Sequence, residues 1–121
     1  MPARDVYPYF EQALAPSAAR TASGDSGPFW GYGPASTLRV QLNVTAASGT
    51  PTLDVVVEDT LDGGANWNTL ATFSQKTGPG HQVVDYSGPF ADRIRARWTI
   101  GGTTPSFTFS VVCASQVPQV S

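Results

Sequence analysis

Apolar residues occupy every second position along several short segments, and this period of two constrains the fold more than any other feature of the chain. Residues 37–45 place Leu, Val, Leu and Val on one side and mostly polar residues on the other. Similar alternation recurs in residues 53–58, 94–100 and 106–113. Successive side chains of a strand point to opposite faces, so each segment has one face for a core and one for solvent. The pattern predicts half-buried strands.

Turn-forming residues separate these segments. Gly- and Pro-rich stretches interrupt the chain at residues 46–51, 60–66, 76–80 and 101–105. We expect further strands at 67–73 and 82–86. About six or seven short strands with no helical stretch between them are typical of an antiparallel β-sandwich, of jelly-roll or immunoglobulin-like type, or of a small barrel. A chain of 121 residues can bury a real core as one domain.

The apolar positions of the predicted strands define the expected core. Its members are Leu38, Val40, Leu42, Val55, Val57, Trp67, Ile94, Trp98, Phe107 and Phe109. Cys113 is the last apolar position of the final strand, so we expect it to be buried and unreactive. Because it is the single cysteine, an intrachain disulfide and a Cys-based zinc site are excluded.

The first part of the chain has a different composition. Residues 1–35 contain Pro2, Pro8, Pro16, Pro28 and Pro34, which interrupt ladders and helices. We predict an extended N-terminal arm over 1–35, with one short strand around 19–23 and one or two helical turns within 9–15. The sandwich domain is expected at 36–115 and a loose tail at 116–121.

Such an arm has few local hydrogen bonds, so it must pack on something, either its own sandwich or a neighbouring subunit, and we expect a partner to supply the surface. Deleting residues 1–18 should then leave the sandwich folded. Large aromatic residues dominate interface energies, and three of them stand at the front of the arm. These candidate contact residues are Tyr7, Tyr9 and Phe10.

Charge is sparse along the whole chain. Charged residues make up 13%, and seven Lys and Arg against nine Asp and Glu give a net charge of −2. This balance argues against nucleic-acid binding, which needs a concentrated positive surface. No apolar run is long enough to span a membrane, and the first residues lack the apolar centre of a signal peptide. We therefore expect synthesis in a cytoplasm. We also expect the protein to be bound to a partner, since isolated small domains usually carry more charge.

The sequence contains little that indicates a catalytic or metal site. His81, the single histidine, follows Gly-Pro-Gly without a nucleophile motif beside it, which favours a loop histidine with no catalytic role. Glu58, Asp59 and Asp62 could serve glycoside hydrolysis, but they flank a hairpin turn where acidic residues hold the backbone. Their spacing does not match a calcium loop. We predict no catalytic residue, no cofactor and no metal.

Residues 60–67, Thr-Leu-Asp-Gly-Gly-Ala-Asn-Trp, resemble an Asp box, the β-hairpin turn of sialidase propellers and other extracellular β proteins. In this turn Asp62 is expected to accept backbone N–H groups, while its glycines adopt positive φ. Trp67 should tuck under the hairpin. The motif occurs once, so it indicates a turn and not a propeller enzyme.

Three arginines alternate along one predicted strand, at Arg93, Arg95 and Arg97. Their guanidinium groups could pair across strands with Asp54 and Glu58, or with carboxylates of a neighbouring subunit. A second candidate group is aromatic: Phe29, Trp30 and Tyr32 lie in a Gly-rich segment. They could cap the core, anchor a protein interface or stack on a sugar.

Residues 46–59, then Asp62-Gly63 and Trp67, then residues 93–102 and 105–111 resemble small virion structural proteins of tailed bacteriophages. Those proteins commonly combine an LxVxVEDSxDGxxW hairpin with an RxRxTxxGxxPSFTFSV terminal hairpin in a β-sandwich. The resemblance covers about residues 37–114. Six Arg against one Lys would suit a GC-rich actinobacterial host.

The resemblance implies a non-enzymatic virion component, first of all a capsid decoration (cement) protein on the capsid exterior. Its partners would be the major capsid protein or other virion proteins, together with copies of itself, with a trimer favoured. A neck or tail protein is the alternative within this class. A carbohydrate-binding module for adhesion is the alternative from another class, with an open aromatic platform where a cement protein would bury its aromatics.

Overall fold

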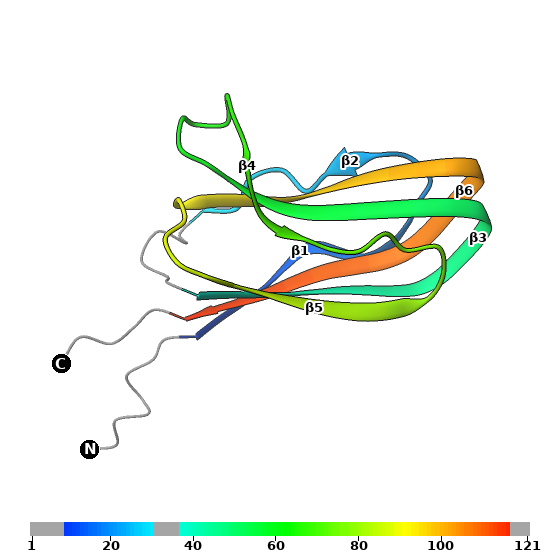
Figure 1. Ribbon diagram of the computed structural model, residues 1–121, viewed down its shortest axis with the longest axis horizontal. Helices are drawn as coiled ribbons and strands as arrows, with labels where there is room; N and C mark the ends of the chain where they lie inside the picture. The colour runs from blue at the N-terminus through cyan, green and yellow to red at the C-terminus, as the bar shows by residue number, and fades with distance from the viewer. Residues whose placement is uncertain (1–8, 31–36, 117–121) are drawn as a thin grey trace, which may run out of the picture.

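A computed structural model describes residues 9–30 and 37–116, and within these ranges every element is a β-strand. The strands are β1 (Tyr9–Arg20), β2 (Gly24–Asp25), β3 (Thr37–Thr60), β4 (Asn68–Thr72), β5 (Gly80–Ser87) and β6 (Arg93–Gln116). All their pairings are antiparallel, as predicted (Figure 1). Within the same ranges, no helix of a length and apolarity suited to crossing a membrane occurs.

The two longest strands, β3 and β6, pair with each other over their whole length of 24 residues. Thr37 lies opposite Gln116 at one end of this ribbon, and Thr60 lies opposite Arg93 at the other. The ribbon bends over at its middle, so that its two halves face each other (Figure 1). Residues 46–51 and 101–105 were expected to end strands. That expectation is wrong, because the strands continue through the bend.

Glycines make the bend possible. Register shifts in the β3–β6 pairing lie between Val44 and Ala46 and between Ser48 and Thr50. Gly102 has a φ of 99°, and a Cβ atom there would clash with the backbone carbonyl oxygen of Thr50. The close approach of the two backbones therefore requires a residue without a side chain.

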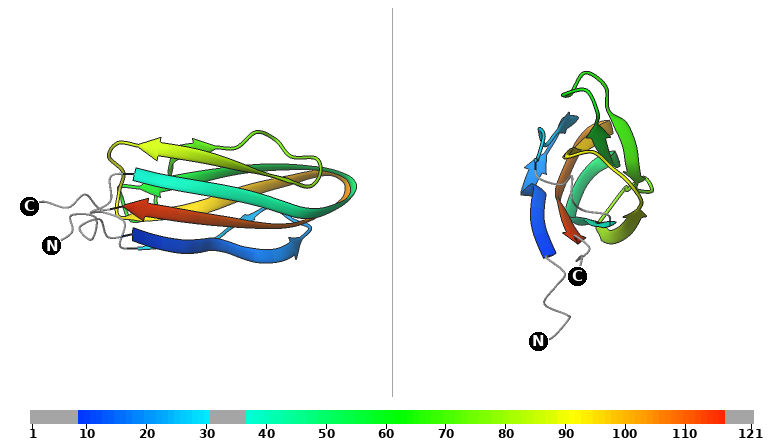
Figure 2. Two further views of the ribbon diagram at one scale, coloured as in Figure 1. Left: turned by 90° about the horizontal axis from the view of Figure 1, so that it is seen from below. Right: turned by 90° about the vertical axis from the view of Figure 1, so that its left-hand side faces the viewer.

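The bend divides the sheet into two layers. In layer A, β5 and β1 flank the N-terminal half of β3 and the C-terminal half of β6. In layer B, β4 and β2 flank the C-terminal half of β3 and the N-terminal half of β6. Figure 2 (left) shows β5, β3, β6 and β1 side by side in layer A. The resulting architecture is the predicted antiparallel β-sandwich.

The core fills the space between the layers. Every residue of the predicted core is buried except Trp67, and Cys113 is buried as expected, with 1% of its surface exposed. Trp67 is half-buried and lies on the outer side of layer B, so its assignment to the core is wrong. The core also contains apolar residues of β1, β3, β6 and the segment after β4 that were not predicted, among them Leu14, Val44, Leu53, Phe73 and Val111.

Strand β1 overturns the expectation for the N-terminal region. It pairs with β6 from Tyr9 opposite Gln116 to Arg20 opposite Phe107, so the expected helical turns and the short strand around 19–23 are wrong. Two register shifts between Ala13 and Ala18 accommodate Pro16. Leu14 is buried in the core. Of the two surfaces expected for the arm, its own sandwich holds residues 9–30, and the favoured expectation of a partner is wrong for these residues.

Candidate partner interface

The arginine stripe lies on the outer side of layer B. Ile94, Ala96 and Trp98 of β6 are buried, so the alternating arginines between and before them face outward, as the sequence pattern predicted. Glu58 of β3 lies opposite Arg95 in the register of the β3–β6 ribbon. The ribbon therefore brings a carboxylate into the middle of the stripe.

Glu58 holds two of the three arginines. Its Oε1 accepts hydrogen bonds from Nε of Arg95 at 3.0 Å and Nε of Arg97 at 3.2 Å, and its Oε2 accepts one from Nη2 of Arg97 at 3.2 Å. Only 4% of Glu58 is exposed, so these bonds stabilise a nearly buried carboxylate. Asp54, the other expected partner, accepts a hydrogen bond from Gln75 instead.

Two arginines of the stripe also contact tryptophan rings. The guanidinium carbon of Arg93 lies 3.7 Å from the ring centroid of Trp30, and that of Arg95 lies 4.2 Å from the ring centroid of Trp67. Both distances are within the range of cation–π attraction. Trp30 remains 61% exposed, which is unusual for so large an apolar side chain.

The backbone beside Trp30 is fixed to β6. The N–H of Phe29 donates to the carbonyl of Ile94 at 2.8 Å, and the N–H of Ile94 donates back at 3.0 Å. Phe29 packs against the core, while Trp30 faces solvent. Within one predicted aromatic group, the structure thus separates a core residue from a surface residue.

The Asp-box turn between β3 and β4 has the expected geometry. Asp62 accepts hydrogen bonds from the backbone N–H of Asn66 at 2.8 Å and from its side-chain amide at 2.7 Å. Gly63 and Gly64 have φ values of 75° and 104°. The indole N–H of Trp67 donates to the Gly64 carbonyl at 3.1 Å. The side-chain and backbone bonds from Asn66 lower the pKa of Asp62 below its ordinary value.

This turn adjoins the arginine stripe. A Cβ atom on Gly63 would lie 3.5 Å from Nη1 of Arg93, so the turn lies against that guanidinium group. Leu61, within the turn, is 81% exposed. We call the surface formed by Trp30, Leu61 and Arg93 the Trp–Arg patch. Among the described residues Arg93 makes no ion pair, unlike Arg95 and Arg97.

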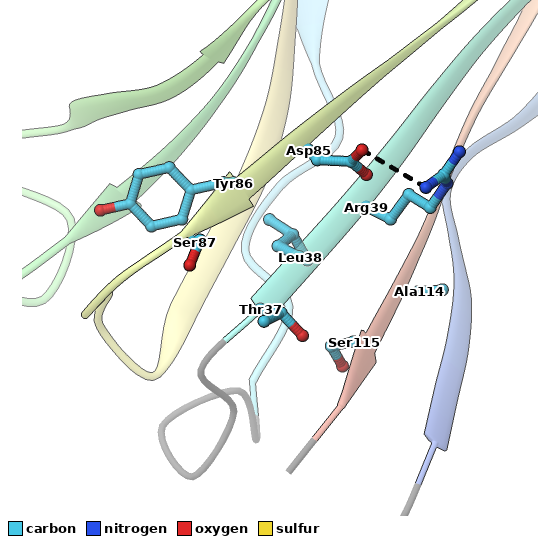
Figure 3. Close-up of a pocket in the computed structure, with 8 residues that line it drawn as sticks. All are labelled: Thr37, Leu38, Arg39, Asp85, Tyr86, Ser87, Ala114 and Ser115. Atoms are coloured by element: carbon cyan, nitrogen blue, oxygen red, sulfur yellow. Dashed lines mark hydrogen bonds and ion pairs between the residues drawn. The ribbon is translucent and has the colours of Figure 1, made fainter. Parts of the chain in front are cut away.

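A hollow of about 320 Å³ lies on layer A, where β3 begins and β5 and β6 end (Figure 3). Arg39 and Asp85 meet at its side with 3.3 Å between Nη1 and Oδ2. The hydroxyl oxygen of Ser115 is buried there, with no hydrogen-bond partner in the described part of the chain. No sequence motif marks this hollow, because its residues come together only through strand register.

The other acidic residues and the histidine have structural positions. Asp59 accepts a hydrogen bond from the backbone N–H of Ala91 at 2.8 Å and so holds the turn before β6. His81 lies at the exposed start of β5, opposite Asn43 of β3. Across residues 9–30 and 37–116, no group of three His, Cys, Asp or Glu side chains is arranged to hold a metal ion.

Some predicted contact residues fall outside the description. Tyr7 and Tyr32 lie outside the described residues, and for Tyr9 and Phe10 the structure describes the backbone in β1 but not the side chain. Their role in an interface stays a prediction.

Comparison with solved structures shows the fold at low sequence identity. The SPBc2 prophage-derived protein YomS superimposes with a TM-score of 0.60 at 12% identity, over 92% of this chain and 95% of that one. VP2 of infectious bursal disease virus, in its subviral particle, gives a TM-score of 0.61 at 10% identity. The match covers 94% of this chain but only 33% of VP2.

A third similar structure is a xylanase fragment of Clostridium thermocellum that contains the CBM22-1 and GH10 modules. Its TM-score is 0.51 at 16% identity, over 97% of this chain and 27% of that one. No protein-family model and no curated protein matches the sequence. The β-sandwich fold is therefore shared with viral and carbohydrate-related proteins alike.

Proposed function

We propose that this chain is a non-enzymatic virion structural protein of a tailed bacteriophage, and specifically a decoration protein that bridges capsid subunits on the capsid exterior. The observation that carries the proposal is the Trp–Arg patch, in which Trp30 and Leu61 are exposed beside Arg93. The fold likeness to a prophage-derived protein over nearly the full length of both chains supports it. The resemblance of residues 37–114 to phage virion proteins points the same way.

The patch suggests how the partner is held. Trp and Arg are the residues most enriched among those that dominate binding energy in protein interfaces. Trp30 and Leu61 would bury apolar surface, while Arg93 would pair with a carboxylate of the major capsid protein or another virion protein. Contacts repeated over a capsid lattice reinforce one another, because each link raises the effective concentration of the next. Tyr7, Tyr9, Phe10 and Tyr32 would extend this contact.

Phage particles that lack the protein provide the test, after deletion of its gene in the encoding phage. Purified wild-type protein should co-sediment with these particles, and electron microscopy should place it on the capsid. The double variant Trp30→Ala/Arg93→Ala should bind at least roughly tenfold more weakly, since hot-spot truncations usually cost more than one factor of ten. Val112→Ala is the control, because Val112 is an exposed apolar residue on layer A, away from both the Trp–Arg patch and the β5 edge.

The possible results separate the alternatives. Density on the neck or tail would replace the capsid position but keep the virion role. A protein absent from the particle, and unable to bind it, would overturn the proposal. Equal binding by the double variant and wild type would remove the Trp–Arg patch from the interface.

A carbohydrate-binding adhesion module is the second candidate, favoured by the exposure of Trp30 and the fold likeness to the xylanase fragment. A sugar ring stacks on an open aromatic face, but Arg93 already covers one face of Trp30. Titration of soluble cell-wall polysaccharides with Trp fluorescence as the readout tests this role. Saturable binding that Trp30→Ala abolishes would support the adhesion module over the decoration protein.

A further inference from the structure

The four edge strands of the sandwich differ in how they avoid pairing with other chains. An exposed edge presents unpaired N–H and C=O groups, and proteins protect such edges with proline, bulges or short strands. In layer B, β2 has two residues, and β4 has five with a register shift beside Glu58. Both are too short to offer a long ladder.

In layer A, β1 carries several protective features. It contains Pro16 and two register shifts. The guanidinium group of Arg20 donates hydrogen bonds to two carbonyls of β1 itself, those of Pro16 at 2.8 Å and Ala18 at 3.2 Å. These features use up or distort the backbone groups that a further strand would need.

Strand β5 lacks proline, bulges and a short length, and the segment before it contacts the strand through the Gln82 side chain, which accepts hydrogen bonds from Ser74 and Lys76. Its eight residues, Gly80–Ser87, pair with β3 without a register shift, and they include neither proline nor lysine. None of the eight is buried. Figure 2 (left) shows β5 at the border of layer A, on the side opposite to β1. In the described part of the chain, β3 is its only paired neighbour.

We propose that β5 pairs antiparallel with β5 of a second copy of this chain, about a twofold axis at Val83, and so joins two layers A into one continuous sheet. Residues directly opposite each other in a sheet share a face, so the axis must pass through a residue and not between two residues. Axes at Val83 and at Val84 both pair seven of the eight residues, 80–86 and 81–87 respectively.

The side chains that would lie opposite each other distinguish these two registers. His81, Val83 and Asp85 share the outer face, because their β3 partners alternate with the buried residues of that strand. An axis at Val83 places His81 opposite Asp85 of the second copy, twice per dimer. An axis at Val84 places Asp85 opposite Val83 instead. An imidazole N–H can donate to a carboxylate directly opposite, and a Val83–Val83 pair adds aliphatic contact, so Val83 is the favoured axis.

The neighbouring strand supports this register. Arg39 of β3 pairs with Asp85 at 3.3 Å, and both side chains are exposed on the outer face. Dimerisation would therefore build a row of Arg39, Asp85 and His81 of the second copy across the joined sheet. Asp85 would lie between two positive or hydrogen-bond-donating groups, which is a self-complementary arrangement. This inference does not depend on the virion role.

Sedimentation equilibrium of the full chain tests the proposal, from about 10 µM to about 1 mM, near neutral pH, where a weak dimer would be populated. Val83→Lys places two lysines opposite each other, and His81→Glu places a carboxylate opposite Asp85 of the second copy. Each should raise the dimer dissociation constant at least roughly tenfold. Circular dichroism shows whether each variant is folded.

Two matched variants should keep the dimer. Gln41→Lys adds the same charge on the same face one strand further in, opposite Val83 of its own chain. His81→Lys keeps a hydrogen-bond donor opposite Asp85 of the second copy. A wild-type protein that stays monomeric at about 1 mM, or that forms a trimer, would overturn the proposal. So would a folded Val83→Lys variant that dimerises as well as wild type.

Discussion

The two layers of the sandwich are built from the two halves of one ribbon, yet they are held together differently. Layer A is flanked by strands of twelve and eight residues, with long ladders to β6 and β3. Layer B is flanked by strands of two and five residues. On the outer side of layer B, Glu58 joins two arginines, whereas on layer A Arg39 and Asp85 form an exposed pair.

Side chains replace missing backbone pairing along the β2 side of layer B. Hydroxyl oxygens of Ser26 and Ser23 accept hydrogen bonds from the backbone N–H groups of Ala96 and Ile100, each at 2.9 Å. Asp25 lies 3.6 Å from Nη1 of Arg95 and adds a charge to the same edge. Where the flanking strand is short, polar side chains satisfy the ladder groups of β6. We therefore expect layer A to be destabilised most by removal of a flanking strand, and layer B most by substitution of polar side chains.

The largest expected effect is on layer A, from deletion of residues 1–18. The deletion removes most of β1 together with Leu14 and Ala15, which are both 2% exposed. It would uncover the β6 edge and the core beneath it, so we expect loss of cooperative unfolding. Leu14→Ala alone should lower the free energy of unfolding by about 2–5 kcal/mol.

Urea unfolding followed by circular dichroism measures both changes. Ala18→Ser is the control on the same strand, at an exposed position, and should change the free energy of unfolding by less than about 0.5 kcal/mol. A truncated protein with wild-type stability would show that β1 contributes little to layer A. The residues 1–35 would then behave as the separable arm that the sequence suggested.

The period-two pattern was sufficient to predict the strands of the β3–β6 ribbon, and nine of the ten residues that it assigned to the core are buried. It missed β1, because Pro16 and the small alanines around it hide the alternation and the strand is bulged there. It also led to the prediction of two turns that end strands at the bend of the ribbon. Glycine is common both in turns that end strands and at bends within strands. The pairing of Gly102 with Pro51 shows that the strands continue here, and the sequence alone does not reveal this pairing.

The next effect compares the ion pairs of the two layers. Glu58→Gln keeps the shape of a nearly buried side chain but removes the charge that holds Arg95 and Arg97. We expect a loss of about 1–3 kcal/mol in the free energy of unfolding, as for other hydrogen bonds to buried charged groups. Asp85→Asn removes the exposed pair of layer A and should cost about 0–1 kcal/mol.

Both variants can be measured by urea unfolding at a protein concentration low enough to keep the chain monomeric. An equal loss for Glu58→Gln and Asp85→Asn would contradict the view that layer B depends more on its side chains. Salt provides a further check, because only the exposed pair should weaken strongly as ionic strength rises.

The candidate interface was partly visible in the sequence. The arginine stripe and the Asp box could be predicted because each depends on residues close together in the chain. The contact between Trp30 and Arg93 could not, since it depends on the bridge between Phe29 and Ile94, which are far apart in sequence. The exposure of Leu61 and the open edge of β5 likewise follow from packing and register, which no local pattern encodes.

The smallest expected effect concerns the Asp-box turn of layer B and its response to acid. Hydrogen bonds from Asn66 hold the pKa of Asp62 below the ordinary value of 3.8, so the folded turn favours the charged carboxylate. A lowered folded-state pKa contributes stability above the unfolded pKa, and this contribution is lost as the pH falls below about 4.

Protection of the Asn66 amide from hydrogen exchange should therefore decrease a few-fold between pH 6 and pH 3, while the Val57 amide in the core stays protected. In Asp62→Asn the Asn66 amide should show little dependence on pH, because no carboxylate titrates in the turn. Unchanged protection of Asn66 at pH 3 in the wild type would mean that the glycines and Trp67 alone maintain the turn, and that its polar side chains do not stabilise it as those around Glu58 do.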